Sequence, residues 1–128
     1  MTREDRELLL KDLGGRLPYG VKILDVPVNV VGKLFLISTT DTVQYETADD
    51  TGMQTLYNIK PYLLPLSSMT EEEQRTLDSM CNGVEMVSRL SGLKMFDKAF
   101  NWLNENHFDY RGLIEKGLAI DATGLNIY

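Results

Sequence analysis

The sequence predicts an α+β fold in one domain, and three observations lead to this prediction. Amphipathic helical segments stand at the start of the chain and again in its second half. Short runs rich in valine, isoleucine and tyrosine fill the stretch between them. The 128 residues match the usual size of one domain with its own core. We therefore expect a single domain over residues 1–128, in which an N-terminal helix precedes a small antiparallel β-meander and C-terminal helices pack on the sheet.

The first segment predicts a helix over residues 2–13. Thr2 can cap its first turn, and Asp5 stands three residues later, which is the spacing of a capping box. Leucines that recur at helical spacing form the expected buried stripe: Leu9, Leu10, Leu13 and Leu17. We expect Gly14 and Gly15 to end this helix, because glycine is common just beyond a helix C-terminus.

The next forty or so residues predict short strands joined by turns. The expected strands are Val21–Val26, Val28–Ile37, Val43–Thr47 and Gln54–Ile59. Their connections are too short for parallel crossovers, so neighbouring strands are expected to pair antiparallel. The number of strands stays open between three and five, and the sheet between an open meander and a partial barrel. Two prolines in residues 59–68 predict an extended connector that lies against the core.

A full capping box marks the start of the second predicted helix. Thr70 stands at the N-cap and Glu73 three residues later, and three glutamates occupy the first turn. An apolar stripe continues at helical period to Leu90, which fits either one long helix or two helices with a break near Asn82. Cys81 lies on this stripe and is expected to be a small buried hydrophobe, since a nucleophilic cysteine needs an electropositive, partly exposed setting.

Two more helices are predicted near the end of the chain. The third covers residues 95–106 and carries an apolar face made of Phe96, Ala99, Phe100 and Leu103, with Trp102 alongside. The fourth is short, with Asp109 as its N-cap and Gly117 as the glycine just beyond its end. The tail from Leu118 to Tyr128 is expected either to add a strand or to trail off.

Composition limits the classes of function. The formal net charge is −6, with 13 basic against 19 acidic residues, which disfavours nucleic-acid binding by simple phosphate neutralisation. A nucleic-acid-associated regulator, our first alternative, requires these basic residues to converge on one face: Lys60, Arg75, Arg89, Lys94 and Lys98. Cys81 is the only cysteine, so an intramolecular disulfide and a thiolate zinc cluster are excluded, which suits the cytoplasm. No apolar run approaches a membrane span, so no membrane contact is expected.

Few groups in the sequence have the pattern that catalysis needs. His107 is the only histidine, and pairing with Asp109 two residues later would let it act as a general base. The capping signals around Asp109 account for this pair without catalysis. We find no metal-binding, phosphate-loop or nucleophile motif, so we expect neither a metal nor a cofactor. A small enzyme or ligand-binding protein is the second alternative, and it requires a pocket that gathers His107, Asp109 or Arg111.

Aromatic residues and an arginine gather at the junction of the last two predicted helices. Ten residues of sequence contain Trp102, Phe108, Tyr110 and Arg111. Such side chains are the usual anchors of protein interfaces. The candidate interaction surface is therefore Trp102, His107, Tyr110 and Arg111. The competing interpretation places Trp102 and Phe108 in the core and leaves Arg111 stacked on the surface.

Several stretches of the chain resemble a known family. They are Leu17–Lys22, Ile59–Leu63 with Ser67–Glu73, Trp102–Asn104 and His107–Ala119. In these stretches the sequence resembles a family of short proteins of unknown function from gut-anaerobe genomes and prophage-like regions. The resemblance implies a cytoplasmic or phage-related accessory protein and no catalytic residue. Our leading hypothesis is a non-catalytic protein-interaction module with a protein partner, and self-association stays open.

Overall fold

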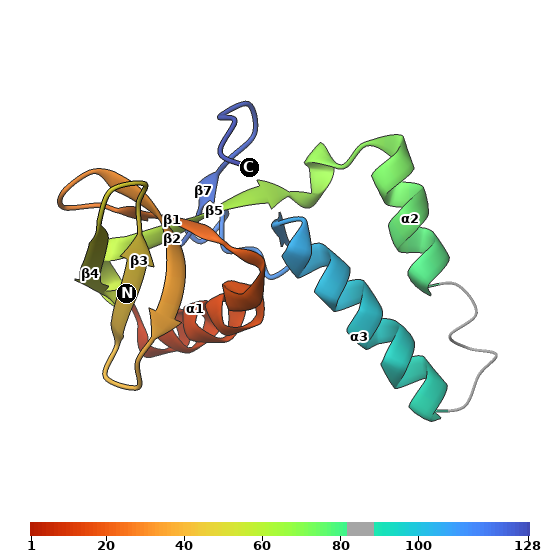
Figure 1. Ribbon diagram of the computed structural model, residues 1–128. Helices are drawn as coiled ribbons and strands as arrows, with labels where there is room; N and C mark the ends of the chain where they lie inside the picture. The colour runs from red at the N-terminus through yellow and green to blue at the C-terminus, as the bar shows by residue number, and fades with distance from the viewer. Residues whose placement is uncertain (82–88) are drawn as a thin grey trace.

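A mixed sheet and three α-helices make up the computed structural model, which describes residues 1–81 and 89–128 (Figure 1). This is the α+β class that the sequence predicts. In chain order the elements are α1 (Arg3–Arg16), β1 (Lys22–Asp25), β2 (Val30–Ile37), β3 (Thr42–Glu46), β4 (Thr51–Thr55), β5 (Ile59–Pro65), α2 (Glu71–Cys81), α3 (Arg89–Glu105), β6 (Phe108–Asp109) and β7 (Ile120–Asp121). None of the helices in this described part of the chain has the length and hydropathy to cross a membrane.

The sheet joins the expected meander to parallel pairs that the sequence analysis did not predict. Strands β1 to β4 pair antiparallel in succession, and the order across the sheet is β4-β3-β2-β1-β5-β6, with β7 also paired to β5. β5 was expected as a connector, but it is a central strand that pairs antiparallel with β1 and parallel with β6 and β7. Its prolines fit because their fixed φ is compatible with an extended strand. Pro61 also lies opposite Ile23 at a position where the ladder to β1 needs no N–H.

The first helix begins where predicted and ends later. Thr2 and Asp5 make both hydrogen bonds of the capping box. The prediction that the paired glycines end the helix is wrong, because α1 passes through both of them to Arg16. Gly15 instead faces α3, where the Nδ2 atom of Asn104 would lie 3.1 Å from an added Cβ. This glycine therefore permits the close approach of two helices.

The hydrophobic core lies between α1 and the face of the sheet that α1 covers (Figure 1). Alternate residues of β1, β2 and β3 are buried on this side, as the period of a half-buried strand requires. Its members are Leu9, Leu13, Val21, Ile23, Leu34, Val43, Tyr45, Leu56, Ile59, Leu63, Leu113, Leu118 and Ala119. The stretch after β6 thus closes the core even though it contains little regular structure.

The Tyr45 side chain organises the buried face of the meander. Its ring packs against Gly32 on β2 and Gly52 on β4, and a Cβ on either glycine would overlap the ring. Its hydroxyl donates to the buried carboxylate of Asp25 at 2.6 Å, and the amide of Gln54 donates to the other oxygen at 3.0 Å. The hydrogen bond to Asp25 and the burial of the ring raise the pKa of Tyr45 to about 12. A buried charge on β1 is thereby satisfied from two other strands.

The helices α2 and α3 form an arm that extends away from the sheet (Figure 1). Among the α3 side chains that the structure describes, Ala99 and Leu103 are buried, and the helix contacts α1 and β6 of the body. α2 has no buried residue, and Cys81 at its end is exposed, so the prediction of a buried cysteine is wrong. Packing does not close around α2, so its helical stripe does not become core. The predicted break near Asn82 lies outside the described residues.

The prediction of a short fourth helix between Asp109 and Gly117 is wrong, because this stretch forms hydrogen-bonded turns. Its capping residues still perform their local chemistry. The Asp109 carboxylate accepts the main-chain N–H groups of Leu113 and Ile114, both at 3.0 Å. Gly117 adopts a left-handed φ of 73° and donates to the carbonyl of Ile114. Burial of Leu113 draws the chain into the core before a helix can extend, and the tail then adds β7, as one of the two expectations had it.

Substitution of Gly52 by alanine should destabilise the protein by about 1–3 kcal/mol, because the new methyl overlaps the Tyr45 ring. Gly14→Ala is the matched control, since no atom lies within 4 Å of an added Cβ there and alanine favours the helix. We expect this control to raise the free energy of unfolding by about 0.5–1 kcal/mol. Urea denaturation of both variants measures the difference, and equal effects would contradict the packing described for Tyr45.

Candidate functional site

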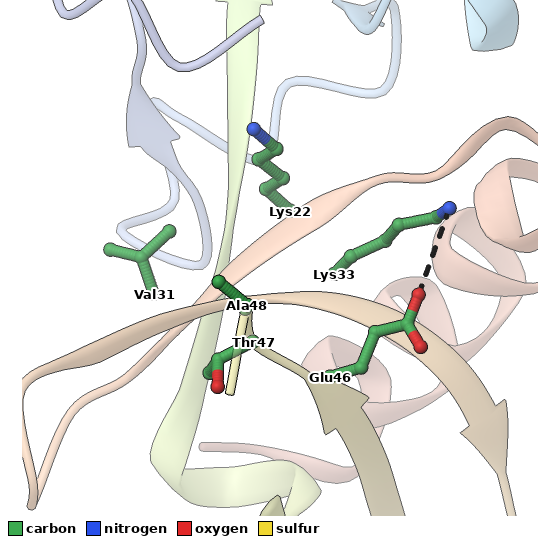
Figure 2. A pocket seen from close by; sticks show the side chains of 7 residues that line it. Lys22, Val31, Lys33, Glu46, Thr47 and Ala48 are labelled. Atoms are coloured by element: carbon green, nitrogen blue, oxygen red, sulfur yellow. Dashed lines mark ion pairs between the residues drawn. The ribbon is translucent and has the colours of Figure 1, made fainter. Parts of the chain in front are cut away.

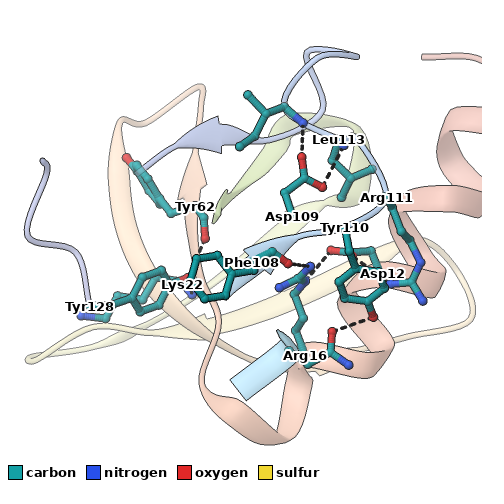
Figure 3. A network of polar contacts seen from close by, with 12 residues as sticks. Asp12, Arg16, Lys22, Tyr62, Phe108, Asp109, Tyr110, Arg111, Leu113 and Tyr128 are labelled. Carbon is teal, nitrogen blue, oxygen red and sulfur yellow. Dashed lines mark hydrogen bonds and ion pairs between the residues drawn. The ribbon is translucent and has the colours of Figure 1, made fainter. Parts of the chain in front are cut away.

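Two arginines share one buried carboxylate between α1 and the segment that follows α3 (Figure 3). The Asp12 side chain is fully buried, and its two oxygens accept from Arg16 Nε at 2.8 Å and Arg111 Nη1 at 2.9 Å. Arg16 is also fully buried, and its Nη2 donates to the main-chain carbonyl of Phe108. Buried charges of this kind are tolerated only when paired and hydrogen-bonded. The cluster therefore fixes the end of α1 against β6.

The ring of Tyr110 lies between the arginines of this cluster. The guanidinium carbon of Arg111 is 4.7 Å from the ring centroid and that of Arg16 is 5.3 Å from it. The hydroxyl donates to the side chain of Asn104 at 2.8 Å. The ring also meets Phe100 of α3, with 5.3 Å between centroids. Cation–π contacts and a hydrogen bond thus hold Tyr110 in one orientation beside the arm.

His107 is buried and neutral rather than poised as a base. Burial is the main cause that lowers the pKa of His107, and the positive charges of Arg16 and Lys22 act in the same direction, so that the pKa is about 4. Its backbone has a left-handed φ of 64°, and its ring stacks on Tyr128 with 3.5 Å between centroids. Asp109 uses both carboxylate oxygens on main-chain N–H groups, so the His–Asp pair considered for catalysis does not form.

The structure divides the four residues of the sequence-based candidate surface. Trp102 is half-buried and stacks on Phe108, with 5.8 Å between centroids. His107 lies inside, whereas Tyr110 and Arg111 are only partly buried. The sequence analysis missed Asp12 and Arg16, because it ended the first helix at residue 13, and their i, i+4 spacing signals an ion pair only when the helix continues to Arg16.

An exposed line of side chains continues from Tyr110 and Arg111 onto the arm. Phe96 and Phe100 lie one turn apart on α3 and are 45% and 46% exposed. The sequence analysis placed both on one apolar face with Ala99 and Leu103, but only Ala99 and Leu103 of these four are buried. We call the set Phe96, Phe100, Tyr110 and Arg111 the aromatic strip. Two of its members, Tyr110 and Arg111, also contact the buried Asp12 cluster.

A pocket lies elsewhere, over the sheet (Figure 2). Its volume is about 290 Å³, and it is lined by Lys22, Val31, Gly32, Lys33, Glu46, Thr47 and Ala48. Within it the Lys33 amine lies 3.8 Å from the Glu46 carboxylate. This pocket contains neither His107 nor Arg111, so it does not supply the setting that the enzyme hypothesis requires. Over the described ranges, no three His, Cys, Asp or Glu side chains are placed to hold a metal ion.

The basic residues considered for nucleic-acid binding are spread over the molecule. Lys60 is exposed on β5, whereas Lys94 and Lys98 are exposed on α3. Arg75 on α2 forms an exposed ion pair with Glu71 at 3.6 Å. The side chain of Arg89 is not among those that the structure describes. These positions provide no observation in favour of a basic face.

Comparison with known proteins gives no further guide to the site. No family model, no curated protein and no solved structure matches the chain. The candidate surface is therefore defined by its own geometry, and the family resemblance stays an expectation.

Asp12→Asn should destabilise the protein by about 3–5 kcal/mol, because it leaves the buried Arg16 and its neighbour Arg111 without a counter-charge. The control is Glu7→Gln, which breaks another i, i+4 ion pair of the same helix, with Arg3, on the exposed side. That change should cost less than about 1 kcal/mol. Thermal and urea unfolding of the two variants compare these effects, and a small cost for Asp12→Asn would refute the role given to the cluster.

Acidification should destabilise the protein through His107. Its folded pKa is about 4, below its usual 6.5, so the unfolded chain takes up the proton first. The contribution of His107 is therefore complete above pH 6.5 and is lost as the pH falls from 6.5 to 4, by up to about 3 kcal/mol. His107→Asn tolerates the left-handed backbone and removes the titration. Urea unfolding at several pH values should show a shallower decline in this variant, and parallel profiles would contradict the assignment.

Proposed function

We propose that the protein is a non-catalytic protein-interaction module and that the aromatic strip contacts its partner. One observation carries this proposal. Phe96 and Phe100 are exposed on α3, which extends away from the sheet (Figure 1), and Phe100 contacts Tyr110, which in turn contacts Arg111. The buried Asp12 cluster holds Tyr110 and Arg111 in place. Aromatic residues and arginine dominate the binding energy of protein interfaces. The strip offers both, with Tyr110 in contact with Phe100 on one side and with Arg111 on the other.

The buried cluster supports this proposal because it reduces the cost of binding. Arg111 is held by Asp12, and Tyr110 is held by Asn104 and by the two guanidinium groups. Side chains that are already ordered lose less conformational entropy when a partner binds. The strip therefore combines exposed apolar area on α3 with preorganised anchors next to it.

Charge favours a protein over a nucleic acid as the partner. The net charge of −6 opposes a polyanion, and the arginine of the strip is already paired with a carboxylate. The family resemblance supports a phage-linked or mobile-element-linked accessory role in the cytoplasm, which we include in the proposal.

Two variants of matched exposure test the proposal. Phe100→Ser alters the strip, and Phe35→Ser alters a phenylalanine that is 41% exposed on β2, away from the strip. The tagged wild type and the two variants are used as bait in a nuclease-treated lysate of the native cell, and captured proteins are quantified by mass spectrometry. We expect one stoichiometric partner, recovered equally by Phe35→Ser and at least about tenfold less by Phe100→Ser.

Two outcomes would overturn the proposal. Equal recovery of the partner by both variants would place the interface elsewhere, and loss of all recovery on nuclease treatment would favour the nucleic-acid alternative. Circular dichroism of each variant verifies that differences in recovery do not come from unfolding.

A further inference from the structure

The ladder between β1 and β5 opens at its end to admit a tyrosine hydroxyl. The two strands pair from Asp25 to Ile23, and the alternation of hydrogen-bonded pairs makes Lys22 and Tyr62 the next bonded pair. The N–H of Lys22 instead donates to Tyr128 Oη at 2.8 Å, and that hydroxyl donates to the carbonyl of Tyr62 at 2.8 Å (Figure 3). A phenol thus replaces one main-chain hydrogen bond of the sheet.

The ring of Tyr128 is held by a second element. It lies nearly parallel to the imidazole of His107, with 3.5 Å between centroids and 10° between planes. Lys22 Nζ donates to the carbonyl of Ile127 at 2.7 Å, which fixes the backbone next to the ring. The slot therefore consists of a donor from β1, an acceptor from β5 and the flat face of His107.

The two sides of this contact differ in how firmly they are held. Lys22 and Tyr62 belong to the centre of the sheet, and His107 is buried. Tyr128 is 45% exposed, Leu125 is 50% exposed, and the residues between Ala122 and Ile127 are all exposed. A segment with few buried apolar contacts opens at a lower free energy than the sheet on which it lies. The slot can therefore persist when its occupant leaves.

We propose that this slot is a binding site for a phenol ring and that Tyr128 is its built-in, displaceable occupant. A phenol both donates and accepts through one atom, which matches the N–H of Lys22 and the carbonyl of Tyr62. Its flat ring matches the face of His107 on which Tyr128 stacks. An apolar ring without the hydroxyl would leave both main-chain groups of the sheet unsatisfied.

The phenol can come from a small molecule or from the tyrosine of a peptide segment. The same three groups of the slot recognise both, and the segment adds the contact that Ile127 makes with Lys22. This proposal is independent of the aromatic strip, which uses none of the slot residues.

The first experiment uses Tyr128→Ala and the probe p-cresol. Proton–nitrogen NMR spectra should show saturable shifts at the amides of Lys22 and His107, with an affinity at least about tenfold higher than for the wild type, in which Tyr128 competes. Toluene should bind at least about tenfold more weakly than p-cresol, because it restores neither hydrogen bond. Absence of saturable shifts, or equal binding of toluene, would overturn the proposal.

A second variant keeps the test valid if Tyr128→Ala does not fold. Tyr128→Phe keeps the ring and loses both hydrogen bonds, so p-cresol should displace it more readily than it displaces wild-type Tyr128. Leu125→Ala changes an exposed residue of the same segment and should bind p-cresol as the wild type does. A capped peptide with the sequence of residues 125–128 separates the sources: tighter binding than p-cresol assigns the slot to a tyrosine segment, and equal binding assigns it to a small phenol. The proposal would be overturned if neither p-cresol nor the capped peptide bound to the Tyr128→Phe variant.

Discussion

Burial of the Asp12 carboxylate constrains much of this molecule. Two cations, Arg16 and Arg111, converge on it, and one of them has no access to water. Since an unpaired charge there would be very costly, α1 must continue to Arg16 and the segment after α3 must lie beside it. This explains why a helix runs through Gly14 and Gly15. Tertiary pairing at its end outweighs the low helix propensity of the two glycines.

One arginine of this cluster contributes to the state of the neighbouring histidine. Burial is the main cause that lowers the pKa of His107, and the positive charges of Arg16 and Lys22 lower it in the same direction. A neutral imidazole presents a flat uncharged face, on which Tyr128 stacks. Burial also raises the pKa of Tyr128 to about 12, so its hydroxyl keeps the proton that it donates to Tyr62. Electrostatics in α1 thereby support a contact in the distant tail.

Local signals in the sequence predicted local structure, and long-range contacts decided the rest. The capping pair of Thr2 and Asp5 was readable because it acts within one turn. The sequence also predicted that Asp109 caps the residues after it, and its carboxylate does accept the N–H of Leu113. The predicted helix does not form, because Leu113 is buried in the core and the chain around it makes turns. For the candidate site, Tyr110 and Arg111 were found from composition. The partner that positions Arg111 was not, because it lies 99 residues away in the sequence.

The exposed edge of the sheet is a less favourable site for the proposed partner than the arm. β4 is an edge strand, and such strands recruit other strands through free main-chain groups. The N–H groups of Thr51 and Thr55 are already taken by the side chains that precede them, Asp50 at 2.8 Å and Gln54 at 2.9 Å. Strand addition would have to break these bonds first. The arm carries no such protection over its exposed phenylalanines, so association through side chains on α3 is favoured over pairing at β4.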